Sequence, residues 1–124
     1  MWVRRASRAY RATIPTPGGL LTSLTPYSES LERVRSVLVF FAATGSANAA
    51  VLAELESEVR IAVSAARAAL LPAAEVHADL DRVARVTLPP SSAASASRLM
   101  NGWAMLAFER AARRSASEAD ELRS

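Results

Sequence analysis

Residues 52–70 read LAELESEVRIAVSAARAAL, and this stretch decides the fold. Its large apolar residues recur at intervals of three and four, and charged residues fall between them. Because about 3.6 residues complete one turn of an α-helix, this spacing places the apolar side chains on one face. That stripe comprises Leu52, Leu55, Val59, Ala62, Ala66 and Leu70. We therefore expect a helix over about 47–71, the longest of the chain, with one face packed against other elements.

Three further segments show the same spacing. They predict helices over about 27–44, 73–88 and 92–114, the second of which starts after Pro72 and stops at Pro89-Pro90. Nothing alternates with period two over a useful length, so we expect no sheet. The sequence predicts an all-α fold: an up-down bundle or helical hairpins of three to four helices, since a single rod kinked at Pro72 could replace two of them.

Composition limits what this core can be. With 124 residues and 51% hydrophobic residues, the chain has enough apolar material for one domain. Aromatic residues make up only 6% and alanine is abundant, which favours closely packed helices with small side chains. The absence of cysteine excludes disulfides, thiolate nucleophiles and cysteine-ligated metals.

Surface charges fit helices as well. Four acidic residues each precede an arginine by four positions, which predicts ion pairs along exposed helix faces. The pairs are Glu29–Arg33, Glu56–Arg60, Asp81–Arg85 and Glu109–Arg113. Residues 29–124 hold eleven arginines and twelve acids, so the positive net charge of the chain comes from its N-terminus.

Residues 1–14, MWVRRASRAYRATI, contain no acid. On a helix, Arg4, Arg5, Arg8 and Arg11 fall on one side, and Trp2, Ile14 and other apolar residues fall on the opposite side. This basic amphipathic segment resembles a mitochondrial presequence, which implies a mitochondrial protein in the matrix or at the inner membrane. The alternative is a basic arm on a bacterial cytoplasmic protein, where the same arginines contact a nucleic acid or anionic lipid.

Residues 15–26 hold prolines at 15, 17 and 26 and the Gly18-Gly19 pair, so we expect an extended arm between the basic segment and a helical domain over 27–114. Leu20, Leu21 and Leu24 are then expected to lie in a groove on the body or on a neighbouring protein. Residues 115–124 are predicted to form a polar tail.

A membrane span is the second interpretation of residues 36–53, which contain no charge. Thr44, Gly45, Ser46 and Asn48 lie in the middle of this stretch, where a bilayer would penalise polar groups. They suit a turn and a helix cap, so a hairpin between two helices is the preferred interpretation.

Catalytic motifs are lacking. His77 lies one turn before Asp81 without a nucleophile or a second base, and Glu54 and Glu58 share a helix face without a histidine partner. Gly18-Gly19 lacks the remaining residues of a nucleotide-binding loop. We therefore expect no catalytic residues, no cofactor, no metal and no enzyme activity.

These observations favour a non-catalytic accessory subunit of a large organellar assembly, such as a respiratory or ATP-synthase complex, with other protein subunits as partners. The alternatives are a mitochondrial ribosomal protein that contacts rRNA through its arginines, and a free-standing protein-binding module of a bacterium with GC-rich DNA. Trp103 is either a buried anchor or an outward contact for a partner helix. The expected contacts with partners or anionic surfaces are Arg4, Arg5, Arg8, Arg11, Leu20, Leu21, Leu24, Trp103, Arg110, Arg113 and Arg114.

Overall fold

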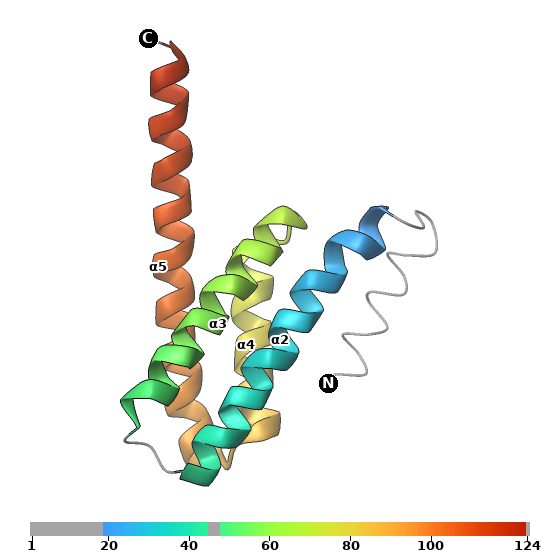
Figure 1. Cartoon of the computed structure of the whole chain (residues 1–124), viewed down its shortest axis with the longest axis vertical. Coiled ribbons are helices and arrows are strands. Elements are labelled where there is room, and N and C mark those ends of the chain that lie inside the picture. Colours follow the sequence, from blue (N-terminus) through green and yellow to red (C-terminus); the bar gives the residue numbers. More distant parts are fainter. Residues whose placement is uncertain (1–18, 45–47, 124) are drawn as a thin grey trace.

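The computed structural model describes residues 19–44 and 48–123, with the side chains of residues 25–43 and 48–123 (Figure 1). They form four helices: α2 (Gly19–Thr44), α3 (Ala49–Ala68), α4 (Ala73–Thr87) and α5 (Pro90–Arg123). Successive helices run in opposite directions, so the described part of the chain is an up-down bundle (Figure 1). The all-α prediction is confirmed, and Pro72 separates two helices that pack as distinct elements.

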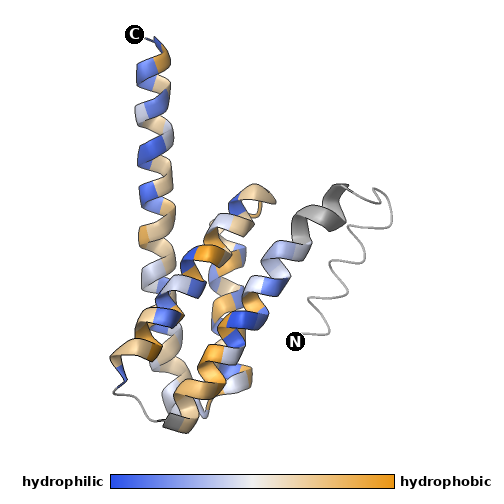
Figure 2. Ribbon diagram, viewed as in Figure 1, coloured by the Kyte–Doolittle hydropathy of each residue, from blue (hydrophilic) through white to orange (hydrophobic). Residues whose placement is uncertain are grey.

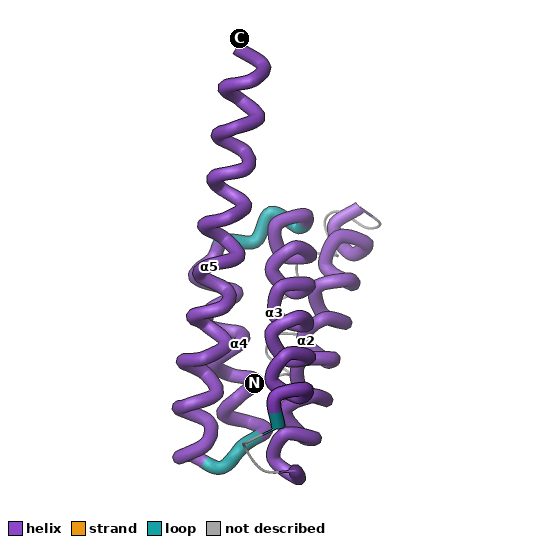
Figure 3. Tube along the Cα trace, turned by 60° about the vertical axis from the view of Figure 1, so that its left-hand side comes forward, coloured by secondary structure: helices purple, strands orange, loops and turns teal. Residues whose placement is uncertain are grey.

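The helices surround one core. α2 packs against α3 and α4, and α5 packs against the same two helices. α2 packs antiparallel to α3, and α4 packs antiparallel to α5, whereas α3 and α5 run parallel to each other (Figure 3). This arrangement places the last turns of α3 beside the middle of α5.

The core consists of medium-sized and small side chains. Its fully buried large members are Tyr27, Leu31, Leu38, Leu55, Leu80, Met100, Val34, Val59, Val76 and Val83. Buried alanines lie between them, which lets the helix backbones approach closely, as the composition predicts. Hydrophobic residues follow the inner faces of the helices, and the part of α5 beyond the bundle is largely hydrophilic (Figure 2).

The predicted stripe of α3 is mostly correct. Leu55, Val59, Ala62 and Ala66 are buried, and Leu52 is half-buried. Leu70 is 89% exposed, so its place in the stripe is wrong. It follows the end of α3 with φ at 61°, and the amide of Leu71 bonds back to the carbonyl of Ala66. This is the Schellman termination of a helix, which turns the residue at the left-handed position away from the core.

α2 is longer than predicted. It begins at Gly19 rather than near residue 27, so residues 19–26 are helical and not an extended arm. Pro26 lies inside this helix. The fixed φ of proline is compatible with helical backbone. Pro26 costs α2 one backbone hydrogen bond and crowds the preceding turn, and α2 nevertheless continues through it. Pro15 and Pro17 lie outside the described residues.

α5 is also longer than predicted. It starts at Pro90, a favoured first position, and continues to Arg123, so residues 115–123 of the predicted polar tail belong to the helix. This segment has no glycine or proline, and an Arg123–Asp120 ion pair of 2.9 Å supports its last turn. Because α5 starts at Pro90, Ser91 and Ser92 lie within the first turn of this helix.

Within residues 36–53, α2 ends at Thr44 and α3 begins at Ala49, and residues 45–47 lie outside the described residues. Asn48 caps α3, and its side-chain oxygen accepts hydrogen bonds from the amides of Ala50 and Val51 at 2.9 and 3.3 Å. Within residues 19–44 and 48–123, no helix combines the length and the hydropathy that crossing a bilayer requires.

Candidate functional site

A buried carboxylate joins α2 to α4. The hydroxyl of Tyr27 donates a 2.6 Å hydrogen bond to Oδ2 of Asp79, and Nη1 of Arg82 donates to Oδ1 at 3.1 Å. Asp79 is only 1% exposed. A buried carboxylate needs such partners, because leaving it without them would cost several kcal/mol. The site is therefore part of what fixes the helix packing.

Sequence reasoning missed Asp79. The sequence does contain a signal for it. Asp79 lies three residues after Val76 and four residues before Val83, which places it on the apolar face of α4. An acid on such a face needs a buried partner, and Tyr27 supplies it from a helix that is remote in sequence.

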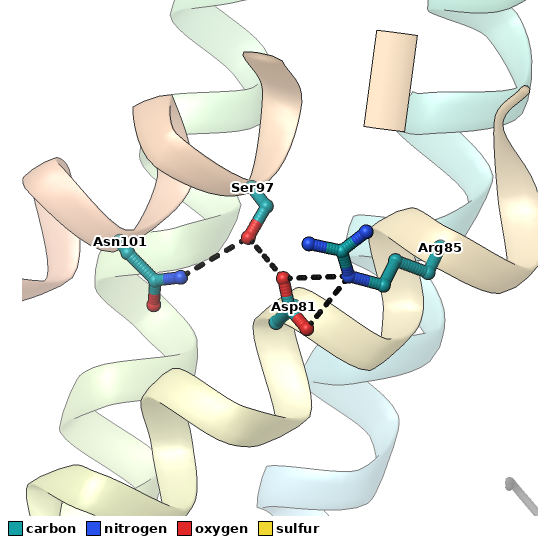
Figure 4. Close-up of polar contacts among 4 residues, drawn as sticks. All are labelled: Asp81, Arg85, Ser97 and Asn101. Atoms are coloured by element: carbon teal, nitrogen blue, oxygen red, sulfur yellow. Dashed lines mark hydrogen bonds and ion pairs between the residues drawn. The ribbon is translucent and has the colours of Figure 1, made fainter. Parts of the chain in front are cut away.

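A second polar network joins α4 to α5 (Figure 4). Asp81 accepts hydrogen bonds from Nε of Arg85 at 2.9 Å and from the hydroxyl of Ser97 at 2.7 Å. Asn101 donates to the Ser97 hydroxyl at 3.3 Å, and its Oδ1 lies 2.6 Å from Nδ1 of His77. Five side chains thus form one chain of contacts between the two helices.

The electrostatics of this network hold Asp81 ionised. The hydrogen bond from the Arg85 guanidinium, and then that from the Ser97 hydroxyl, lowers the pKa of the Asp81 carboxyl below its usual value. The Ser97 proton points at a carboxylate and not at a histidine, so the Ser–His–Asp order of a nucleophilic site is not formed here. His77 contacts Asn101 and lies beside Phe108, with 6.3 Å between the ring centroids.

Arginines line a cleft of about 220 Å³ between α3 and α5. We call this the arginine cleft; its lining residues are Arg60, Val63, Ser64, Arg67, Ala107, Arg110, Ala111 and Arg114. Arg60 is paired with Glu56 at 2.6 Å. Among the described residues, Arg67, Arg110 and Arg114 form no ion pair within 4.0 Å. Within the described part of the chain, three guanidinium groups of the cleft therefore have no carboxylate partner.

An apolar cavity lies at the other end of the bundle. It measures about 280 Å³ where α2, α3 and the start of α5 meet. Phe41, Leu55 and Leu99 supply most of its apolar lining, and three serines of α5 also line it. None of the described residues that line it is charged.

The structure separates the predicted contact residues. Arg110 and Arg114 come together in the arginine cleft, whereas Arg113 is exposed outside it, with Nη2 3.7 Å from Glu109. Trp103 is half-buried against the core, between the two predicted alternatives.

The remaining predicted contacts lie at the N-terminal side. Leu20, Leu21 and Leu24 belong to α2 and not to an extended arm. The four N-terminal predicted contacts, Arg4, Arg5, Arg8 and Arg11, lie outside the described residues.

Glu54 and Glu58, which share a helix face, do not act together. Glu58 bonds to Nε of Arg33 on α2 at 3.0 Å, and Glu54 is exposed. In the part of the chain that the structure describes, no group of three or more histidine, aspartate or glutamate residues could hold a metal ion.

Comparison with known proteins finds no match to this chain among protein-family models, curated proteins or solved structures.

Proposed function

We propose that this chain is a non-catalytic accessory subunit of a larger protein assembly, and that α5 docks it to a partner. The projection of α5 carries this proposal. Ala111 is the last buried residue of the helix, and residues 112–123 are all exposed (Figure 1). At 1.5 Å per residue these twelve residues form about 18 Å of helix, whose first turn, with Arg114, still lies beside α3 and whose remainder projects beyond the bundle.

The projecting part of α5 continues the helix face that is buried within the bundle. The buried residues Met100, Ala104 and Ala111 of α5 are followed at intervals of four and three by a docking face of Ser115, Ala119 and Leu122. Leu122 is 89% exposed. A twelve-residue helix without packing is marginal in water, and a polar helix that leaves its domain suits a bridge to another one. A partner helix packed on the docking face would supply the missing burial.

Two further observations support the proposal. His77, the single histidine, is hydrogen-bonded to Asn101 and lies against Phe108, which suits a structural role. Residues 1–14, which are basic and contain no acid, support an organellar location. The purification that identifies the partner also tests this location, because it shows whether organellar proteins co-purify.

The test is purification from the native cell with a tag on a flexible C-terminal linker. Ala119→Arg places a charge on the docking face, and Ser117→Arg places the same charge on the opposite side of α5 as a matched control. We expect a stoichiometric partner with the wild type and with Ser117→Arg, and at least about tenfold less with Ala119→Arg, as for a charge buried at an interface. A wild-type chain that purifies as a monomer or homodimer contradicts the proposal.

A further inference from the structure

We propose that the arginine cleft binds a phosphate-bearing anion through Arg60, Arg67, Arg110 and Arg114. None of these residues belongs to the docking face of α5, so this binding site and the docking proposal stand or fall separately. The lining residues of the cleft come from the last turns of α3 and from the part of α5 that lies beside them. Figure 1 shows α5 passing this end of α3 before it leaves the bundle.

The helix geometry aims the four side chains at one space. Arg60, Ser64 and Arg67 are spaced by four and three on α3, and Arg110 and Arg114 are spaced by four on α5, so each set lies on one face. Between the two sets the floor is made by Val63, Ala107 and Ala111. The small alanines leave the space of about 220 Å³ open between the guanidinium groups.

The charge of the cleft is local. Residues 48–123 contain nine arginines and ten acids, so the bundle as a whole is not basic. Elsewhere on these helices Arg82, Arg85, Arg113 and Arg123 each pair with a carboxylate, and among the described residues only Arg98 stands outside the cleft without an ion pair. Guanidinium groups stay charged at any physiological pH, so three unneutralised ones at one cleft repel each other, and a bound anion would remove that repulsion.

Helix electrostatics account for only one of these arginines. Arg67 lies in the last turn of α3, where a cation is favourable beside the negative end of the helix dipole. Arg60 lies two turns earlier and pairs with Glu56 on its own helix, whereas Arg110 and Arg114 belong to the middle of α5 and have no such partner. The convergence of Arg110 and Arg114 on the cleft is what an anionic ligand would explain.

A ligand with two neighbouring phosphates fits best. A phosphate ester carries about −1.5 to −2 charges at neutral pH, so a diphosphate or bisphosphate group balances three free guanidinium groups. Arginine matches phosphate oxygens with two parallel hydrogen bonds. From Arg60 to Arg67 the site spans about 10 Å of helix, which suits a compact anion, whereas a bound RNA strand needs a basic groove that continues along its backbone.

Calorimetric titration of the full chain with pyrophosphate tests this site. In the double variant Arg110→Gln with Arg114→Gln we expect binding at least about tenfold weaker, because two charge-assisted contacts are lost. The matched control is Arg98→Gln with Arg113→Gln, which removes the same charge from exposed positions of α5 outside the cleft. It is expected to change binding by no more than about twofold. The four arginines that these two double variants replace are all exposed, so thermal unfolding should show that both variants are folded.

Ser64→Leu adds a test that leaves every charge in place. Ser64 is exposed at the surface and lines the cleft, so leucine fills the site without disturbing the core. We expect it to weaken pyrophosphate binding at least about tenfold by exclusion. Equal loss in both double variants together with unchanged binding by Ser64→Leu would show general charge attraction and overturn the site.

Two probes identify the source of the phosphates. Phosphatidylcholine vesicles that contain phosphatidylinositol bisphosphate test a lipid headgroup, and pyrophosphate in solution tests a free ligand. If either probe binds and only the cleft variants weaken that binding, the proposal is supported. The probe that binds then shows whether the phosphates belong to a lipid headgroup or to a free ligand. No binding of either probe, or tighter binding of a single-stranded RNA that both double variants weaken equally, refutes it.

Discussion

The Tyr27 hydroxyl donates a 2.6 Å hydrogen bond to Asp79 across the contact between α2 and α4, although the two residues are 52 positions apart. Both are nearly excluded from solvent. A polar pair of this kind tolerates few relative positions of its helices, so it sets how α2 lies on α4 as well as adding stability.

Tyr27→Phe is expected to lower the free energy of unfolding by about 1–3 kcal/mol, because it removes a donor from a buried carboxylate and leaves the ring in place. Urea denaturation followed by circular dichroism measures the change. Tyr27→Phe in an Asp79→Asn background should have a smaller effect, since the charge that the hydroxyl stabilises is gone. An equal effect in both backgrounds would mean that the hydroxyl does not act through its bond to the Asp79 carboxylate.

Leu70→Gly is expected to raise the free energy of unfolding by about 1 kcal/mol. Leu70 has φ at 61°, a region that costs a residue with a Cβ about 1–2 kcal/mol and glycine nothing. Since its side chain is exposed, little packing is lost. Leu70→Ala is the control, because it shortens the side chain and keeps the Cβ. A gain in stability with alanine equal to that with glycine would contradict this explanation.

Asn48→Ala is expected to reduce stability by about 0.5–2 kcal/mol, since the side chain accepts two amide hydrogen bonds at the start of α3. Asn48→Asp keeps an acceptor at this position and should retain most of the stability. Thermal unfolding of the three proteins side by side gives the comparison. A wild-type melting temperature in Asn48→Ala would show that the cap does not contribute.

Asp81 makes the stability depend on pH in the acid range. Its pKa is lower in the folded protein than the usual 3.8, so the contribution is present above that value and is lost as pH falls through the folded-state pKa. Asp81→Asn should therefore show a flatter fall in unfolding free energy below pH 3.8 than the wild type. The side chain is 40% exposed, so solvent screening keeps the effect small. Parallel pH profiles would contradict the linkage.

Periodicity predicted the middle of the fold well. The observed α3 and α4 lie within three residues of their predicted bounds, because the spacing of apolar residues and Pro72 and Pro89 act locally. Three of the four predicted ion pairs form, and Arg33 instead bonds to Glu58 on the neighbouring helix. That exchange depends on packing, which spacing within one helix does not reveal.

The ends of the bundle were harder to predict. Pro26 reads as a helix breaker, yet helical φ suits it and α2 continues through it. In the arginine cleft, Arg110 and Arg114 were predicted contacts, whereas Arg60 and Arg67 were missed. Only the adjacency of α3 and α5 joins these two pairs, and no local pattern in either helix reports it.

The most direct test of the docking role is site-specific photo-crosslinking in the native cell. A photo-reactive phenylalanine derivative replaces Leu122 on the docking face in one strain and Ser117 on the opposite side of α5 in another. The docking proposal predicts one major product larger than the 13.2 kDa chain from position 122, formed with a different protein, and little from position 117. No product from position 122, or the same products from both positions, would contradict it.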